Sequence, residues 1–285
     1  MSAISETFAR CRAEGRAAFV PFIVAGDPDL ATTEELLAVL AEAGADLIEI
    51  GVPFSDPIAD GPVIQAAGQR ALAAGATLGR ILATIARVRG RLGVPLVLFS
   101  YANPILVHGA ARFAEQAAAS GVDGVLIVDL PPEEAAAEVS PALAAHGLDR
   151  ILLLAPTSGP ERIDLVARAG SGFVYYVSRT GVTGEREALA DELPRQLRAV
   201  RRRLRLPVVV GFGISTPEQV AAVAPLADGV VVGSALVRLL HDCRDEPERL
   251  ALVAARARQL AAAVRPAAAE AGGSRRRMRR RAGSS

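Results

Sequence analysis

The sequence predicts a single (β/α)8 TIM barrel, and three observations support this fold class. Eight short apolar runs alternate with Ala-, Leu- and Arg-rich amphipathic stretches along nearly the whole chain. The runs are apolar almost without interruption, as expected of parallel strands that are covered on both faces. Eight such units within about 260 residues fit a closed barrel better than an open sheet.

The predicted elements follow one another in a regular order. The strands are 19–25, 46–51, 94–99, 122–129, 150–154, 172–177, 207–211 and 228–232. The amphipathic stretches between them are 31–43, 78–92, 110–120, 133–146, 160–169, 190–203 and 216–223. Helical stretches at 2–15 and 62–74 are additions to the basic barrel, namely an extra N-terminal helix and an added helix after the second strand.

One short sequence pattern recurs before several of the predicted strands. It reads AGAD at 43–46, SGVD at 120–123 and LADG at 226–229. We expect its glycine to end a helix in a left-handed cap, after which Asp or a small residue leads into the next strand.

Composition excludes several chemistries. All 32 Lys+Arg residues are Arg, so this chain cannot form a lysine Schiff base, carry pyridoxal phosphate on a lysine or build a P-loop. Cys11 and Cys243 are too few and too far apart for a disulfide framework or a cysteine zinc site. The three histidines are scattered without ligand spacing, so no metal is expected.

The charge is distributed unevenly along the chain. Residues 275–281 read RRRMRRR, and without their six charges the net charge of +1 becomes −5 for the rest. We expect residues 1–265 to form the barrel catalytic domain and 266–285 to be a disordered Ala/Gly/Arg-rich tail, with a weak polyanion-binding arm as the alternative. The mildly acidic body predicts no nucleic-acid partner. The absence of a signal-peptide or membrane-spanning run predicts a cytoplasmic protein with no membrane partner.

The first carboxylate of interest is Glu49, which lies between Ile48 and Ile50 in the second predicted strand. If the two Ile pack outward under the helices, strand alternation points Glu49 into the barrel near its catalytic end. Burial would raise its pKa into the range useful for proton transfer at neutral pH. The alternative is a structural carboxylate paired with one of the many Arg, and position alone does not separate the two.

The second carboxylate is Asp60, at the end of a loop that contains Pro53 and Pro57. The prolines limit the loop's conformations and reduce the entropy lost in positioning a side chain. Asp is also common in turns and caps, and this is its more frequent role. A second carboxylate one loop away from a buried one nevertheless suits acid–base chemistry.

The late strand ends carry glycine-containing segments at 178–184, 211–215 and 233–235. Their backbone N–H groups could hold a phosphate after strands six to eight, although each segment alone is a weak signal. Tyr175 and Tyr176 are adjacent, so only one can face inward. Phe22, Phe99 and Phe212 could line an aromatic pocket or simply pack in the core. Together these features predict a barrel enzyme for a phosphorylated small molecule.

The motifs resemble those of one family, the tryptophan synthase alpha chain. The family's signature is similar to IEIGVPFSDPIADG at 48–61, and PFIVAGDPD at 21–29, YANP at 101–104, VSRTGVTG at 177–184 and GFGIS at 211–215 resemble its other motifs. The resemblance covers roughly residues 8–262. It implies a carbon–carbon lyase that cleaves indole-3-glycerol phosphate to indole and D-glyceraldehyde 3-phosphate by a retro-aldol step.

The resemblance also implies site residues. Glu49 would be the general acid/base, Asp60 would bind the indole N–H, and Tyr175 would lie beside the reacting carbons. Thr183 would help to position Asp60. The remaining substrate contacts would be Phe22, Phe99, Leu126 and Phe212 around the indole, and Gly184, Gly213, Gly233 and Ser234 around the phosphate.

The family works with a tryptophan synthase beta chain, which would carry pyridoxal phosphate, receive indole through a tunnel and complete an alpha2beta2 tetramer. The 53–60 loop and neighbouring barrel-mouth loops are the expected interface. Two alternatives remain at this point. One is a binding module that activates a beta chain without turnover, and the other is a different phosphosugar barrel enzyme, such as an isomerase or epimerase.

Overall fold

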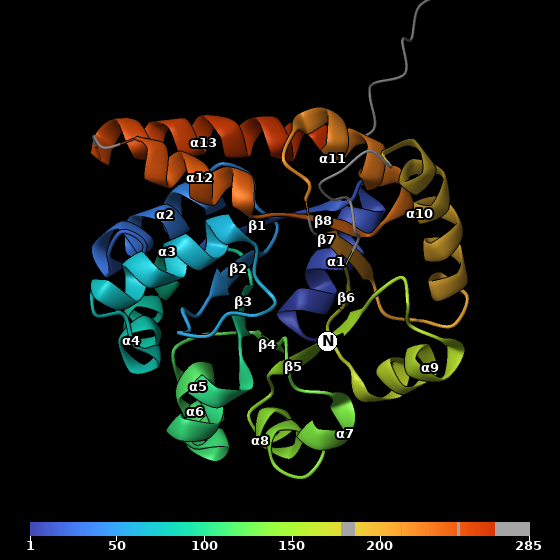
Figure 1. Cartoon of the computed structure of the whole chain (residues 1–285), viewed down its shortest axis with the longest axis horizontal. Coiled ribbons are helices and arrows are strands. Elements are labelled where there is room, and N and C mark those ends of the chain that lie inside the picture. Colours follow the sequence, from blue (N-terminus) through green and yellow to red (C-terminus); the bar gives the residue numbers. More distant parts are fainter. Residues whose placement is uncertain (178–185, 212, 244–245, 266–285) are drawn as a thin grey trace, which may run out of the picture.

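The computed structural model describes residues 1–177, 186–211, 213–243 and 246–265. Eight parallel strands form a closed barrel in sequence order (Figure 1), which confirms the predicted fold class. The strands are β1 (Ala18–Val24), β2 (Ile48–Gly51), β3 (Leu96–Ser100), β4 (Gly124–Ile127), β5 (Asp149–Leu154), β6 (Val174–Val177), β7 (Val208–Gly211) and β8 (Gly229–Val232).

Helices surround the barrel, except for the N-terminal helix, which lies at the centre of this view (Figure 1). They are α1 (Ala3–Ala13), α2 (Leu30–Glu42), α3 (Pro62–Ala73), α4 (Leu78–Val88), α5 (Ala102–His108), α6 (Ala110–Ala119), α7 (Pro132–Ala135), α8 (Val139–Ala145), α9 (Pro160–Ala169), α10 (Arg186–Arg201), α11 (Pro217–Val223), α12 (Ser234–Asp242) and α13 (Glu246–Ala263), with 3-10 turns η1 (Arg89–Arg91) and η2 (Ala224–Leu226). The predicted N-terminal helix is α1, and the predicted helix after the second strand is α3.

Strand alternation divides the core into two apolar layers. The layer between strands and helices contains Phe19, Ile23, Ile48, Ile50, Leu96 and Leu98. The layer inside the barrel contains Val20, Phe22, Val97, Leu126, Tyr175 and Val209. Any side chain at an inward position near the carboxyl ends of the strands therefore faces the region where barrel enzymes place their sites.

Helix α1 closes the amino-terminal end of the barrel. Its Ile4 and Phe8 are buried, and the Phe8 ring lies 5.6 Å from that of Phe173 (centroid to centroid), just before β6. A Cβ at Gly124, the first residue of β4, would lie 2.9 Å from Cδ1 of Ile4, so the start of this strand packs closely against α1. The carboxyl-terminal end is therefore the one left for a site.

Several local predictions differ from the structure. The stretch 133–146 forms two helices, α7 and α8. In one uninterrupted helix Pro141 would have no N–H for the carbonyl of Ala137, and its ring would clash with that carbonyl. Helices α5, α12 and α13 were not predicted. Gly44 and Gly121 have φ of 99° and 83°, as the caps require, but Gly229 is the first residue of β8, so the predicted cap is wrong there.

Among the helices of the described residues, none alone has the length and apolarity to cross a membrane. One pair of consecutive helical segments, Pro62–Ala73 and Leu78–Arg91, is long and apolar enough when the two are taken together, but the pair is bent by 92°.

Candidate active site

Glu49 lies on the inward face of β2, since Ile48 and Ile50 on either side belong to the outer layer. Its side chain is fully buried, and neither carboxyl oxygen has a hydrogen-bond partner within the described part of the chain. Burial raises the pKa of Glu49 from its ordinary 4.5 to about 8. No described arginine pairs with it, so the structure favours a proton-transfer group over a structural ion pair.

Tyr175 is the inward member of the adjacent tyrosine pair. It belongs to the inner layer, whereas Tyr176 belongs to the outer layer and its hydroxyl donates to Oε1 of Gln196 at 2.9 Å. Burial raises the pKa of Tyr175 well above its usual value, and the negative charge of nearby Glu49 raises it further. A Cβ at Gly211 would overlap the Tyr175 hydroxyl, so glycine on β7 makes room for this ring.

Aromatic rings surround this inner site. The Phe22 and Phe99 rings meet edge to face with centroids 5.5 Å apart, and Phe99 lies 6.5 Å from Tyr175. Phe22 on β1 lies opposite Glu49 on β2 in the strand register, and Leu126 on β4 lies opposite Phe99 on β3. The structure therefore brings Glu49 and Tyr175 together with three of the predicted indole contacts.

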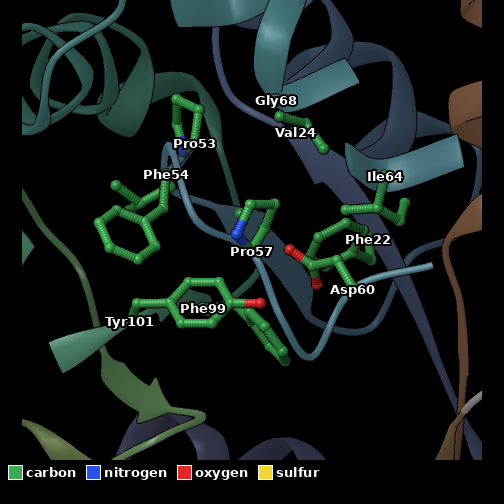
Figure 2. Close-up of a pocket in the computed structure, with 12 residues that line it drawn as sticks. Phe22, Val24, Pro53, Phe54, Pro57, Asp60, Ile64, Gly68, Phe99 and Tyr101 are labelled. Atoms are coloured by element: carbon green, nitrogen blue, oxygen red, sulfur yellow. The ribbon is translucent and has the colours of Figure 1, made fainter. Parts of the chain in front are cut away.

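A pocket opens beside these rings at the carboxyl end of the barrel (Figure 2). Its empty volume is about 310 Å³, counting space that is open to solvent. It is lined by Phe22, Val24, Gly51, Val52, Pro53, Phe54, Pro57, Asp60, Ile64, Gly68, Phe99 and Tyr101. Asp60 is the only carboxylate among these residues, and Glu49 is not one of them, so the two predicted carboxylates lie at different depths.

Asp60 is half-buried, and Figure 2 shows its carboxylate on the same side as the Phe22 ring and the Tyr101 hydroxyl. Burial raises the pKa of Asp60, while a hydrogen bond from Tyr101 partly opposes that rise. A carboxylate at the edge of an aromatic pocket is suited to accept a hydrogen bond from a planar apolar ligand that carries one N–H.

Tyr101 is a site residue that sequence reasoning missed. Its hydroxyl accepts the backbone N–H of Ala59 at 3.0 Å, and its ring lies 5.0 Å from Phe54 (centroid to centroid). The signal was present, because Tyr101 opens the YANP motif directly after β3. An aromatic residue at a strand end is common in cores, however, and only the fold brings it to the 53–60 loop.

Two of the predicted phosphate loops are described. Gly213, after β7, has φ of 78° and is exposed, and Gly233 caps α12, whose first residue is the exposed Ser234. A Cβ at Gly233 would lie 3.1 Å from the Phe22 ring, so this helix start adjoins the aromatic pocket. Thr183, Gly184 and Phe212 fall outside the described residues.

Comparison with known proteins gives the family. The model of the family described as tryptophan synthase alpha chain matches residues 8–265. The chain belongs to this family. It is 60% identical over 241 residues to the tryptophan synthase alpha chain of Geobacter sulfurreducens, covering 85% of this chain and 91% of that one. It is 53% identical over 273 residues to that of Gluconacetobacter diazotrophicus, covering 94% and 99%.

Solved structures of the family agree with the barrel. Tryptophan synthase subunit alpha from Legionella pneumophila superposes with a TM-score of 0.86 at 38% identity, covering 93% of this chain and 98% of that one. An aminoacrylate-bound tryptophan synthase from M. tuberculosis gives 0.83 at 37% identity, covering 93% and 100%. The predicted role of a tryptophan synthase alpha subunit is therefore confirmed.

Proposed function

We propose that this alpha chain is a carbon–carbon lyase that performs the retro-aldol cleavage of indole-3-glycerol phosphate to indole and D-glyceraldehyde 3-phosphate, with no cofactor of its own. The observation that carries the proposal is Glu49, a fully buried carboxyl without a partner in the described residues and with a pKa raised to about 8. Such a group is mostly protonated at neutral pH, so it can donate a proton to substrate.

The proposed reaction moves one proton within the substrate. Glu49 donates its proton to C3 of the indole, which leaves a cation delocalised to the ring nitrogen. The resulting carboxylate then accepts the proton of the 3′-hydroxyl, and the O–H electron pair forms the aldehyde C=O. The C3–C3′ bond breaks, and its electron pair returns to the ring and neutralises the cation. The ring is the electron sink, so neither an imine nor a metal is required.

Asp60 would bind the indole N–H and stabilise the positive charge that develops on the ring. Its place at the pocket edge, beside Phe22 and Tyr101, supports this role. Phe22, Phe99, Leu126 and Phe212 would bound the ring, and Tyr175 would lie beside the reacting carbons. In the remaining assignments, Thr183 would help to position Asp60, and backbone groups at Gly184, Gly213, Gly233 and Ser234 would hold the phosphate.

The proposed partner is a tryptophan synthase beta chain that carries pyridoxal phosphate, in a cytoplasmic alpha2beta2 tetramer. Two exposed apolar side chains support an interface on this side of the barrel: Ile58 in the 53–60 loop is 86% exposed, and Val107 on α5, the helix that follows Tyr101, is 80% exposed. Indole released in the pocket would then pass directly to the partner.

The test is indole release from indole-3-glycerol phosphate by wild type and Glu49→Gln, each with and without a beta chain. Gln keeps the shape but cannot transfer the proton, so we expect turnover to fall by roughly 10²- to 10⁴-fold with substrate binding retained. Substantial turnover by Glu49→Gln would refute the role of Glu49. No release by wild type with retained activation of the beta chain would instead indicate a binding module, and turnover of a non-indole sugar phosphate would indicate another barrel enzyme.

A further inference from the structure

The backbone of the Asp60 loop is held by a side chain that the proposed reaction does not use. Gln65 lies in the first turns of α3, and its Nε2 donates to the carbonyl of Asp60 at 2.9 Å and to the carbonyl of Pro57 at 3.3 Å. The N–H of Asp60 also donates to the Pro57 carbonyl, at 3.1 Å. One amide group therefore joins the two ends of the turn that presents Asp60.

Helix α3 is a fixed platform for this amide. At its other end, Nε and Nη2 of Arg70 donate to the two carboxylate oxygens of Asp27 at 2.8 and 2.7 Å, and Asp27 is only 2% exposed. Asp27 follows β1, so the bidentate pair ties α3 to the barrel wall. Ile64 and Gly68 of the same helix line the pocket. The position of Gln65 is thus set by the barrel and not by the loop.

The Asp60 side chain needs such support. Its described contact is with the Tyr101 hydroxyl, and Tyr101 also accepts the N–H of Ala59. Tyr101 therefore holds one side of the turn and Gln65 the other. Placement of a charged group within a fraction of an ångström matters, because a shift of about 1 Å at a site can lower a rate by about 10²-fold.

We propose that Gln65 is a positioning residue that holds the 57–60 turn so that the Asp60 carboxylate faces the indole pocket. Gln65 acts through Asp60 and does not touch the reacting atoms, and the inference rests on the proposed role of Asp60. Its function requires a donor, because both of its partners are carbonyl oxygens. A glutamate of the same shape would face the same two oxygens with no proton to donate when ionised.

The first test compares Gln65→Ala with Gln69→Ala in the full chain with a beta chain. Gln69 is the same residue type one turn further along α3 and is exposed, so it is a matched control. We expect Gln65→Ala to lower kcat roughly ten- to a hundredfold with a smaller change in KM, and Gln69→Ala to stay within about twofold of wild type. Equal urea midpoints for the two variants would show that folding is not the cause.

The second test is the pH dependence of Gln65→Glu. When its new carboxyl is protonated it can donate one hydrogen bond to the turn, so its activity relative to wild type should rise as pH falls. A flat ratio, or Gln65→Ala as active as Gln69→Ala while wild type cleaves the substrate, would overturn the positioning role. Failure of wild type to release indole would instead overturn the proposed function.

Discussion

Three carboxylates at the amino-terminal end of the barrel differ from Glu49 and Asp60 at the other end in how they are partnered. At the amino-terminal end, Asp46, Asp123 and Asp228 each precede a strand and accept the backbone N–H of a neighbouring strand, from Phe19, Leu96 and Val208 respectively. Each is also paired with arginine. At the carboxyl-terminal end, Glu49 has no partner among the described residues, and Asp60 faces an open pocket. The difference separates carboxylates that stabilise the fold from those free for chemistry.

Asp46 has the most extensive pairing with arginine of these three carboxylates. Arg16 donates to its two oxygens at 2.6 and 2.8 Å, and Arg10 contacts it at 3.3 Å. Burial alone would raise the pKa of Asp46, but the hydrogen bonds from Arg16 and from the Phe19 N–H outweigh it and lower the pKa. Glu49 has burial without these partners, and its pKa rises.

The largest stability effect is expected for Asp46→Ala. It leaves the Arg16 guanidinium, whose side chain is only 10% exposed, without its main partner and the Phe19 N–H without an acceptor. We expect a loss of about 3–5 kcal/mol in the free energy of unfolding, measured by urea denaturation. Because the folded pKa lies below the ordinary 3.8, the stabilisation by Asp46 is present above pH 4 and disappears as pH falls through the folded value.

The same variant checks the functional half of the comparison. Folded Asp46→Ala enzyme, assayed at a temperature well below its unfolding midpoint, should keep the wild-type kcat, because Asp46 lies at the opposite end from the pocket. A kcat lowered tenfold or more in fully folded protein would show that the amino-terminal end is not purely structural.

Glu49→Gln should affect stability with the opposite dependence on pH. Unfolded chains release the Glu49 proton near pH 4.5, whereas the native state holds it until about 8. Wild type therefore loses stability relative to Gln as pH rises between these values, by about 1.4 kcal/mol per pH unit. Between pH 6 and 8 we expect the free energy of unfolding of Glu49→Gln to gain roughly 2–3 kcal/mol over that of wild type. If the stability difference between the two proteins in urea melts did not depend on pH, Glu49 would ionise normally in the native state.

Sequence alone singled out Glu49 and Asp60 as candidates but did not show how their surroundings differ from those of the other carboxylates. Local alternation predicted that Glu49 faces inward once Ile48 and Ile50 pack outward. Whether an arginine reaches it depends on contacts between distant elements, as with Arg16 and Asp46, and no local pattern encodes that.

The same limit explains the other residues that sequence reasoning passed over. Tyr101 reaches Ala59 across 42 positions, and Gln65 looks like any polar residue of an amphipathic helix. Thr183, Gly184 and Phe212, outside the described residues, stay predictions from family resemblance.

Tyr101→Phe tests the carboxyl-terminal end of the barrel, where the pocket lies, and its expected effect is smaller. The hydroxyl that accepts the Ala59 N–H and contacts Asp60 is removed, while the ring keeps its contact with Phe54. We expect a loss of about 1 kcal/mol in transition-state stabilisation, equivalent to roughly fivefold in kcat/KM for indole release. Because this hydroxyl partly opposes the rise in the pKa of Asp60, its removal should also move the acidic limb of the kcat/KM profile to higher pH. An unchanged profile would show that Tyr101 does not support Asp60.

The smallest effect is expected for Arg12→Ala, at the amino-terminal end of the barrel. Arg12 lies 3.3 Å from Asp228, but its side chain is 68% exposed, and Asp228 keeps Arg201 at 2.7 Å and the Val208 N–H at 2.9 Å. Exposed ion pairs contribute little because water screens the charges and ordering the long side chain costs entropy, so the expected loss is about 0.5 kcal/mol or less. Urea melts at low and high salt should differ little between the variant and wild type. A loss above about 1 kcal/mol would mean that the arginines act as a connected network, and that pairing at this end is stronger than its separate contacts indicate.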